Sequence, residues 1–291
     1  MIRRVSSPSE SVQRLEARER GRESGAPAAS LRGRKSWASR VLHRLGSGAL
    51  FVVFGLLSVG LFGLVLPIRL AFTRAREARD LLAQRIVQRA LRSYLRLGEW
   101  LDVFSVDVQG AERLRAGPAL VVANHPTLLD IVMLLAHMPQ ADCVAKREAW
   151  DNPFLRAVVS AAAYIPNDDG EELIARCCER LAAGRSVILF PEGTRSPALG
   201  LQPFRRGAAH IALRSGCAVV PVLLRCDPPS LKKDRPWYVL PDARMRFRIE
   251  VDPPLHFASE PGDASRGLAA RRVTARLREY FERRLADERA T

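Results

Sequence analysis

The stretch from residue 119 to residue 130 reads Ala119-Leu-Val-Val-Ala-Asn124-His125-Pro-Thr-Leu-Leu-Asp130, and its pattern changes abruptly in the middle. The apolar run at its start predicts a strand buried on both faces, as in a parallel sheet. The strand must end at His125-Pro126, because proline has no backbone N–H to donate to the ladder. Thr127 can then cap a helix that carries Asp130. The stretch therefore predicts a strand, a tight corner and a helix, with His125 and Asp130 meeting across the first turn.

Similar apolar runs alternate with helical patterns along the rest of the chain. This alternation predicts an α/β fold, in which a mixed, largely parallel sheet is flanked by helices. Strands are expected at residues 119–123, 142–145, 186–190, 218–224 and 246–251. Helices are expected near residues 127–137, 147–162, 169–184, 206–215 and 265–286.

The N-terminal part of the chain differs from this domain, which is expected over residues 105–291. Residues 1–44 are rich in Arg and Ser and show no apolar period, which predicts a disordered basic tail. Residues 45–68 carry no charged side chain and would form a helix of roughly 36 Å, enough to cross about 30 Å of hydrocarbon. We therefore expect a membrane helix or a hairpin over residues 45–73, since basic residues flank the segment on both sides. Residues 74–104 predict a basic amphipathic helix, which either lies at the membrane interface or packs on the domain.

The charge balance narrows the choice of partners. The chain has 46 Lys and Arg against 31 Asp and Glu, a net charge of +15, which favours nucleic acid, acidic lipid headgroups or an acidic carrier protein. No nucleic-acid-binding motif accompanies the charge, so no nucleic-acid partner is expected. The 5 cysteines are irregularly spaced, which predicts reduced thiols facing the cytosol. No spacing of His and Cys predicts a metal site.

A second motif follows the strand expected at residues 186–190 and reads Pro191-Glu192-Gly193-Thr194-Arg195-Ser196. Gly193 permits a tight turn, and Arg195 with the turn amides can donate to a phosphate or carboxyl group. Glu192 can position a substrate hydroxyl or simply hold the loop. A purely structural turn would contain the same residue types.

The pair His125 and Asp130 has a possible chemical role. Asp130 would hold the imidazole in one tautomer, and the free ring nitrogen could then take a proton from an alcohol. This is the arrangement of a catalytic triad in which the substrate hydroxyl replaces the serine. Taken alone, such a pair is more often structural.

Read together, Asn124–Asp130 and Phe190–Ser196 resemble two sequence blocks of the glycerolipid (lysophosphatidate-type) acyltransferase superfamily. A third block of that family, a short strand ending in proline, resembles Val219-Val-Pro221-Val222. The resemblance implies that His125 is the general base and that Asp130 orients it. The acceptor hydroxyl would attack the thioester of an acyl carrier protein or acyl-CoA, with no other cofactor and no covalent acyl-enzyme.

The resemblance also implies a substrate site and a location. Lys146 is a further candidate beside the donor or the developing oxyanion, or else an ordinary surface lysine. The expected location is the bacterial inner membrane, with the catalytic domain cytoplasmic and membrane lipid as a partner in phospholipid biosynthesis. The implied substrate-binding residues are Asn124, Thr127, Lys146, Glu192, Gly193, Thr194, Arg195 and Pro221.

One block departs from the family pattern. Many relatives carry an arginine after an Ile-Pro-like element, whereas this chain reads Tyr164-Ile-Pro-Asn167-Asp-Asp169. Two carboxylates beside a phosphate would repel it. The expected reaction is conversion of lysophosphatidate to phosphatidate, and the alternative is a non-phosphorylated or specialised acceptor, as in the aryl-polyene branch that this string resembles. A remoter alternative is a non-catalytic basic module bound to a membrane.

Overall fold

The computed structural model describes residues 37–60, 68, 71–73, 75–151, 156–167, 170–197, 200–232, 241, 243–258 and 265–287. All of these except Trp37 belong to one compact unit, Ala38–Thr291. The helices are α2 (Trp37–Gly60), α4 (Arg76–Trp100), the 3₁₀ helix η2 (Ala111–Arg115), α5 (Asp130–His137), α6 (Glu148–Asp151), α7 (Arg156–Ala161), α8 (Gly170–Ala182), α9 (Gly207–Ser215) and α10 (Arg266–Asp287). The strands are β1 (Phe104–Gln109), β2 (Leu120–Ala123), β3 (Ala141–Ala145), β4 (Ile165–Pro166), β5 (Ser186–Leu189), β6 (Val219–Asp227) and β7 (Met245–Val251).

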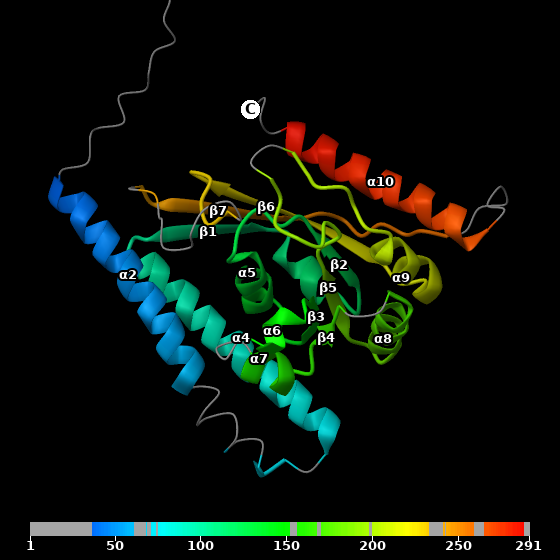
Figure 1. Ribbon diagram of the computed structural model, residues 1–291, viewed down its shortest axis with the longest axis horizontal. Coiled ribbons are helices and arrows are strands. Elements are labelled where there is room, and N and C mark those ends of the chain that lie inside the picture. Colours follow the sequence, from blue (N-terminus) through cyan, green and yellow to red (C-terminus); the bar gives the residue numbers. More distant parts are fainter. Residues whose placement is uncertain are drawn as a thin grey trace, which may run out of the picture. The chain divides into compact units, whose positions relative to one another are not determined.

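Within the described part of the chain, the strands form one sheet of 7 members in the order β1-β7-β6-β2-β5-β3-β4 (Figure 1). Strands β6 and β7 pair antiparallel, whereas the other neighbours pair parallel. This confirms the predicted mixed, largely parallel sheet with flanking helices. The strands expected from the sequence correspond to β2, β3, β5, β6 and β7, while β1 and β4 were not expected.

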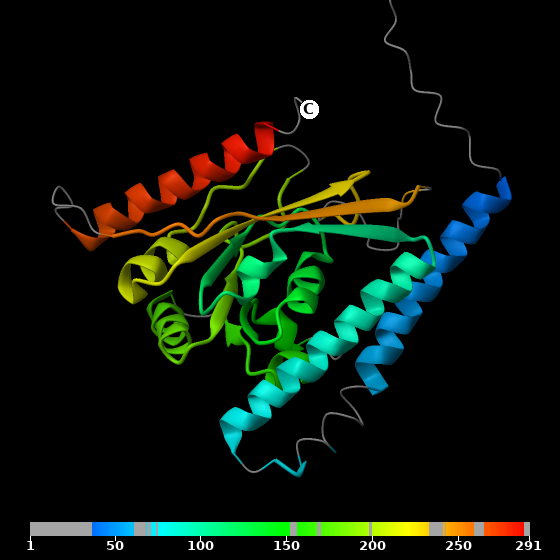
Figure 2. The same ribbon diagram turned by 180° about the vertical axis from the view of Figure 1, so that it is seen from behind.

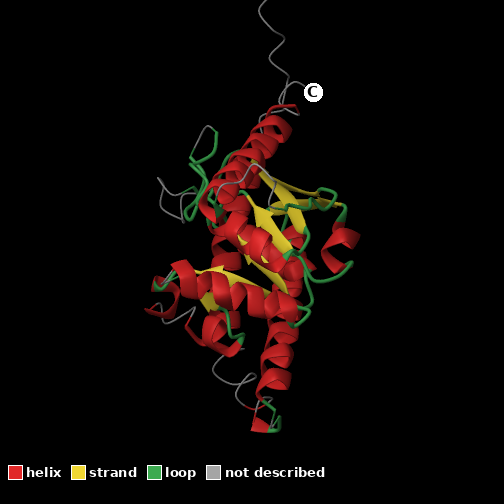
Figure 3. Cartoon of the chain, turned by 90° about the vertical axis from the view of Figure 1, so that its right-hand side faces the viewer, coloured by secondary structure: helices red, strands yellow, loops and turns green. Residues whose placement is uncertain are grey.

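Side chains on β2 show why the sheet needs helices on both faces. Val121 and Ala123 pack into one core, and Leu120 and Val122, which alternate with them, pack into a second. The first core also takes side chains from α4 and α5, and the second takes side chains from α8, α9 and α10. The view of Figure 3 shows the strands enclosed between these two helical layers. A strand that is apolar at every position is thus explained by burial on both faces.

The pairing of β2 with β5 brings the two sequence motifs together. The strands are parallel, with Val122 opposite Leu189, so both end at the same edge of the sheet. The segment after β2 begins with Asn124 and His125, and the segment after β5 begins with Phe190 and the turn at Pro191. Segments that follow the carboxyl ends of neighbouring parallel strands form the usual ligand crevice of α/β sheets.

The two N-terminal helices lie side by side in both ribbon views (Figures 1 and 2). Phe54 of α2 meets Tyr94 of α4 edge to face, with ring centroids 5.2 Å apart. On α4, Val87, Tyr94 and Leu95 are buried. This burial supports the packing alternative for the amphipathic helix expected at residues 74–104.

The segment expected to enter a membrane, residues 45–73, is described only in part. Helix α2 begins at Trp37, inside the stretch expected as a tail over residues 1–44, and ends at Gly60. Residues 1–36, 61–67 and 69–70 lie outside the described residues. Among the described residues, no helix combines the length and the apolar character needed to span a bilayer, so the predicted membrane helix is not found there.

Candidate active site

His125 and Asp130 form the hydrogen-bonded pair that the sequence predicts. His125 Nδ1 lies 2.8 Å from Asp130 Oδ2. Because a carboxylate only accepts, Nδ1 carries the proton and Nε2 keeps its lone pair. The His125 ring also stacks on Phe190, with centroids 4.3 Å apart. The ring is therefore held on one face and at one nitrogen.

Thr127 holds Asp130 in place. The backbone N–H of Thr127 donates to Asp130 Oδ2 at 2.7 Å, and its hydroxyl donates to Oδ1 at 2.5 Å. The same hydroxyl accepts from the N–H of Leu129 at 3.2 Å. Thr127 was expected to cap the helix and to bind substrate. The helix α5 instead begins at Asp130, with Leu129 at the cap position. Thr127 is 1 % exposed and contacts Asp130.

Asn124 extends the pairing between β2 and β6 beyond the backbone ladder. Its side-chain nitrogen donates to the carbonyl of Leu224 at 2.9 Å, and its side-chain oxygen accepts from the Leu224 N–H at 2.8 Å. The side-chain amide thus makes the two hydrogen bonds that a backbone residue of a strand would make, at the point where the chain leaves the sheet. Asn124 is 3 % exposed, so this contact fixes the start of the His125 corner.

Glu192 ties the second motif to the first. One carboxylate oxygen accepts from the backbone N–H of His125 at 3.1 Å and from the hydroxyl of Ser196 at 2.6 Å. The other oxygen accepts from the N–H of Gln202 at 2.8 Å. Ser196 returns the contact by donating its N–H to the carbonyl of His125 at 2.6 Å. Of the two roles open to Glu192 in the sequence, the observed contacts fit the one that holds the loop.

Gly193 has two independent reasons to be glycine. Its φ is +65°, in the left-handed region that favours glycine. A Cβ at this position would also lie 2.7 Å from the Nε of Arg205. The turn therefore admits the guanidinium group of Arg205 beside the motif.

A cavity of about 700 Å³ opens beside this pair of segments. Of the predicted site residues, it is lined by His125, Lys146, Gly193, Thr194 and Arg195. Asn124, Thr127, Asp130, Glu192 and Pro221 do not line it; they support the walls or, for Pro221, lie in β6 beside β2.

Two basic residues of this cavity, Arg205 and His210, were not predicted from the sequence. Arg205 belongs to the string Phe204-Arg-Arg-Gly207, which follows the second motif, so its position in the sequence was a usable signal. His210 lies on α9 without such a signal. Asn167, from the block that departs from the family pattern, also lines the cavity, whereas Asp168 and Asp169 lie outside the described residues.

The charges around the cavity have one sign. Among the described residues, no Asp or Glu lines it, whereas Lys146, Arg195 and Arg205 do. Arg195 donates to the carbonyl of Leu231 at 2.9 Å, so part of its guanidinium is engaged. For Lys146 and Arg205, the described residues supply no side-chain hydrogen-bond or ion-pair partner. The cavity is therefore suited to an anionic group.

Cys143 is the thiol that lines this cavity, and its properties do not suit a nucleophile. Burial raises the pKa of the Cys143 thiol to about 12, so the reactive thiolate is scarce near neutral pH. The other walls are largely aliphatic and include Leu173, Ile174 and Leu189. The chemistry available here is proton transfer by His125 next to an anion site and an apolar wall.

Comparisons with known proteins show what this part of the chain is similar to. Residues 105–225 match the acyltransferase family model. A chloroplastic 1-acyl-sn-glycerol-3-phosphate acyltransferase of Brassica napus is 34 % identical over 128 residues, which cover 42 % of this chain and 37 % of the relative. The 1-acyl-sn-glycerol-3-phosphate acyltransferase of Helicobacter pylori is 34 % identical over 132 residues, 43 % of this chain and 56 % of the relative.

A solved structure shares the fold. The crystal structure of the 1-acyl-sn-glycerophosphate acyltransferase of Thermotoga maritima aligns with a TM-score of 0.62 at 21 % identity, over 84 % of this chain and 98 % of that one. The matches to the Brassica and Helicobacter relatives span about a third to about half of their length. Both motifs and the whole cavity described above lie inside the matched domain. Through residues 105–225, the chain is similar to the acyltransferase family.

Proposed function

We propose that the protein is an O-acyltransferase that transfers an acyl chain from a thioester to the free hydroxyl of lysophosphatidate, giving phosphatidate. The observation that carries this proposal is the His125 imidazole, whose Nδ1 is held by Asp130 while its ring lines a cavity with cationic walls. The relatives named above act on 1-acyl-sn-glycerol-3-phosphate, which agrees with this acceptor.

The arrangement supports a reaction by general base catalysis. Nε2 of His125 removes the proton of the acceptor hydroxyl as its oxygen attacks the thioester carbonyl. Asp130 stabilises the imidazolium that forms. When the tetrahedral intermediate collapses, the C–S bond breaks, and the imidazolium gives its proton to the departing thiolate. The products are an ester and a free thiol, and no group of the protein is acylated.

The acceptor phosphate would bind where the cations gather. Where many relatives carry an arginine after the Ile-Pro element, this chain has Asn167, which lines the cavity. Lys146 and Arg205, which have no side-chain partners among the described residues, supply the positive charge instead. The positive charge thus comes from the end of β3 and from the segment before α9 rather than from the Asn167 block. This supports a phosphorylated acceptor over the alternative without a phosphate.

The donor is proposed to be acyl carrier protein or acyl-CoA, and the aliphatic walls of the cavity suit an acyl chain. A basic chain with a net charge of +15 is a suitable partner for an acidic carrier protein. The membrane lipid partner and the inner-membrane location stay predictions.

The test is an assay of purified protein in which each donor, acyl carrier protein or CoA, is combined with each acceptor, lysophosphatidate or monoacylglycerol. We expect transfer to lysophosphatidate, and His125→Ala should lower the rate by about 10²- to 10⁴-fold, because the general base is lost. His256→Ala, which removes an exposed histidine outside the cavity, is the matched control. Transfer at an unchanged rate in the His125 variant would refute the mechanism, and transfer only to monoacylglycerol would refute the acceptor.

A further inference from the structure

A second, smaller cavity lies at the opposite end of α5 from the pair His125 and Asp130. Asp130 begins the helix and His137 ends it, which separates the two ends by about 10 Å of helix. The cavity has a volume of about 320 Å³. The polar part of its lining comprises Arg92, Arg96 and Glu99 of α4, Arg115 of η2 and His137 of α5.

The arginines of this cavity differ in how they are engaged. Arg92 donates through Nε to the carbonyl of Ala136 at 3.3 Å, next to the end of α5, so it has a structural role as a helix cap. Arg96 and Arg115 have no such role. Among the described residues, neither guanidinium has a hydrogen-bond or ion-pair partner. Arg96 and Arg115 are both exposed, so their guanidinium groups stay open to a ligand from solution.

The acidic side of the cavity does not balance these cations. Glu99 is the acid that lines it in the described part of the chain, and one of its oxygens accepts from the backbone N–H of Val106 at 3.0 Å. Three guanidinium groups from two separate helices thus converge around one carboxylate. Charges of one sign brought together in a concave site create a potential that attracts an ion of the opposite sign.

The charges around this cavity change the pKa of His137. Its Nδ1 lies 2.8 Å from the carbonyl of Met133, so Nδ1 carries the proton in that contact. Burial lowers the pKa of His137, and the positive charges of Arg92 and Arg115 lower it further, whereas Glu99 opposes them. The two arginines therefore act on the same point of the cavity although they come from different elements.

We propose that this cavity is an anion site that binds a phosphate group, separate from the acyl-transfer cavity. The forked donors of Arg96 and Arg115 suit phosphate oxygens, and His137 can add a third donor when it is protonated. The phosphate could belong to a lipid headgroup or be free in solution. Trp100 follows Glu99 closely in α4 and is 80 % exposed, and exposed tryptophan is typical of the membrane–water interface.

The experiment compares the full chain with the double variant Arg96→Ala/Arg115→Ala. A matched control, Arg89→Ala/Arg246→Ala, removes the same charge from exposed positions on α4 and β7 outside the cavity. One arm titrates inorganic phosphate by calorimetry, and a second measures sedimentation with phosphatidylcholine vesicles with and without phosphatidate. In both arms the ring signals of His137 are followed by NMR, since an anion bound by Arg96 and Arg115 should offset the positive charges that lower the pKa of His137.

We expect the double variant to bind the phosphate group about tenfold more weakly or worse, because charge-assisted hydrogen bonds are lost, while the control binds normally. Loss in the phosphate arm identifies free phosphate as a ligand, and loss in the vesicle arm identifies a lipid headgroup. Acyl transfer to a soluble short-chain acceptor should be unchanged in the double variant. Unchanged binding in the double variant would overturn the proposal. Binding that leaves the His137 signals unmoved and is abolished by Lys146→Ala would also overturn it, because the ligand would then lie in the larger cavity.

Discussion

At the scale of single residues, the site depends on side chains that hold His125 rather than touch substrate. The sequence motifs identified the participants, but not all of their roles. Glu192 contacts His125 across 67 positions of sequence, and Asn124 contacts Leu224 across 100. Hydrogen bonds over such distances depend on which strands become neighbours, and spacing within a motif carries no information about that. The pairing of His125 with Asp130 was predictable because both residues lie in one turn.

Glu192→Gln provides a test of this holding role. Glutamine keeps the size of the side chain, and its carbonyl oxygen can still accept from the His125 N–H. In the wild-type protein the second oxygen of Glu192 accepts from the N–H of Gln202, whereas the NH₂ group of glutamine would face that donor and could not accept. The His125 corner should shift, and kcat should fall by about tenfold to hundredfold while KM changes little. Steady-state kinetics beside circular dichroism would measure this, with Gln202→Ala as a control that keeps the backbone donor. A change confined to KM would show instead that Glu192 meets the substrate.

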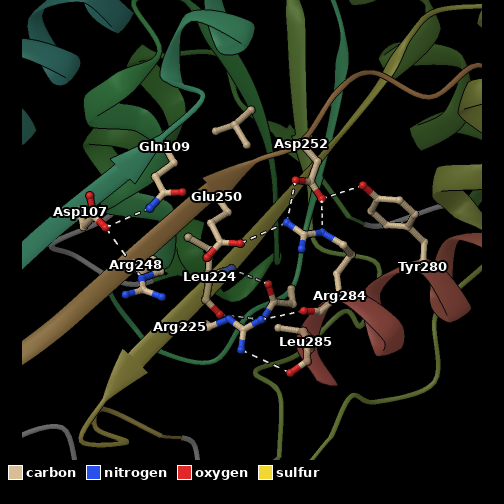
Figure 4. A network of polar contacts seen from close by, with 12 residues as sticks. Asp107, Gln109, Leu224, Arg225, Arg248, Glu250, Asp252, Tyr280, Arg284 and Leu285 are labelled. Carbon is tan, nitrogen blue, oxygen red and sulfur yellow. Dashed lines mark hydrogen bonds and ion pairs between the residues drawn. The ribbon is translucent and has the colours of Figure 1, made fainter. Parts of the chain in front are cut away.

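At the scale of elements, the helix α10 was expected near residues 265–286, and its contacts with the second core explain how it is fixed. Four of its buried side chains belong to the second core, namely Ala270, Val273, Leu277 and Phe281. Figure 4 shows the polar part of the contact. Arg284 donates through Nε and Nη2 to the carboxylate of Asp252, at 2.9 and 3.1 Å, and Tyr280 donates to the same group at 2.6 Å. Arg225 of β6 donates to the carbonyls of Arg284 and Leu285 at the end of the helix.

This cluster predicts a pH-dependent contribution to stability. Burial alone would raise the pKa of Asp252, but the hydrogen bonds from Arg284 and Tyr280 hold it below its ordinary value. The folded carboxyl therefore has the lower pKa, so its contribution is fully present above the unfolded pKa of about 3.9 and is lost as the pH falls through the folded value. Arg284→Ala should lower the free energy of unfolding by about 1 to 2 kcal/mol at neutral pH, allowing for partial exposure.

Urea unfolding at a series of pH values would measure this difference, which should shrink in acid. Arg278→Ala is the matched control, since it breaks an exposed pair with Glu282 on the same helix and should cost only about 0.3 kcal/mol. Equal losses in the two variants, or a loss that does not depend on pH, would contradict the role of Asp252.

Elements at the edges of the sheet were the ones that the sequence did not predict. Strand β1 is short and half-buried, and it pairs with β7, so that Phe104 lies opposite Met245. Strand β4 has only two residues, Ile165 and Pro166. The central strands β2 and β5 are buried at every position because both faces are covered, and their apolar runs are a local signal. An edge strand is defined mainly by its distant partner, and that information is not local.

At the scale of the whole molecule, the acyl-transfer cavity is assembled from segments that are distant in sequence. Lys146 follows β3, Arg195 follows β5, and Arg205 precedes α9. The order of the motifs predicted the fold and the place of His125 beside the second motif, because both motifs follow central strands. The cluster of cations was harder to predict, since Lys146 comes from one connection and Arg195 and Arg205 from another, and these become neighbours only when the sheet has formed. The sequence therefore indicated a missing arginine at Asn167 without showing what replaces it.

Arg205→Ala tests that replacement. Removing this cation should lower kcat/KM for lysophosphatidate by about tenfold or more, because a charge-assisted hydrogen bond to the phosphate is lost, and should leave the rate with monoacylglycerol nearly unchanged. Arg206→Ala is a stringent control, since the neighbouring arginine has the same charge and is also exposed but does not line the cavity. Added salt should weaken use of lysophosphatidate by the parent protein more than by the Arg205 variant, because the screened attraction is already missing there. An equal loss for both acceptors would mean that Arg205 supports the turn at Gly193, against which it packs, and that the phosphate is bound elsewhere.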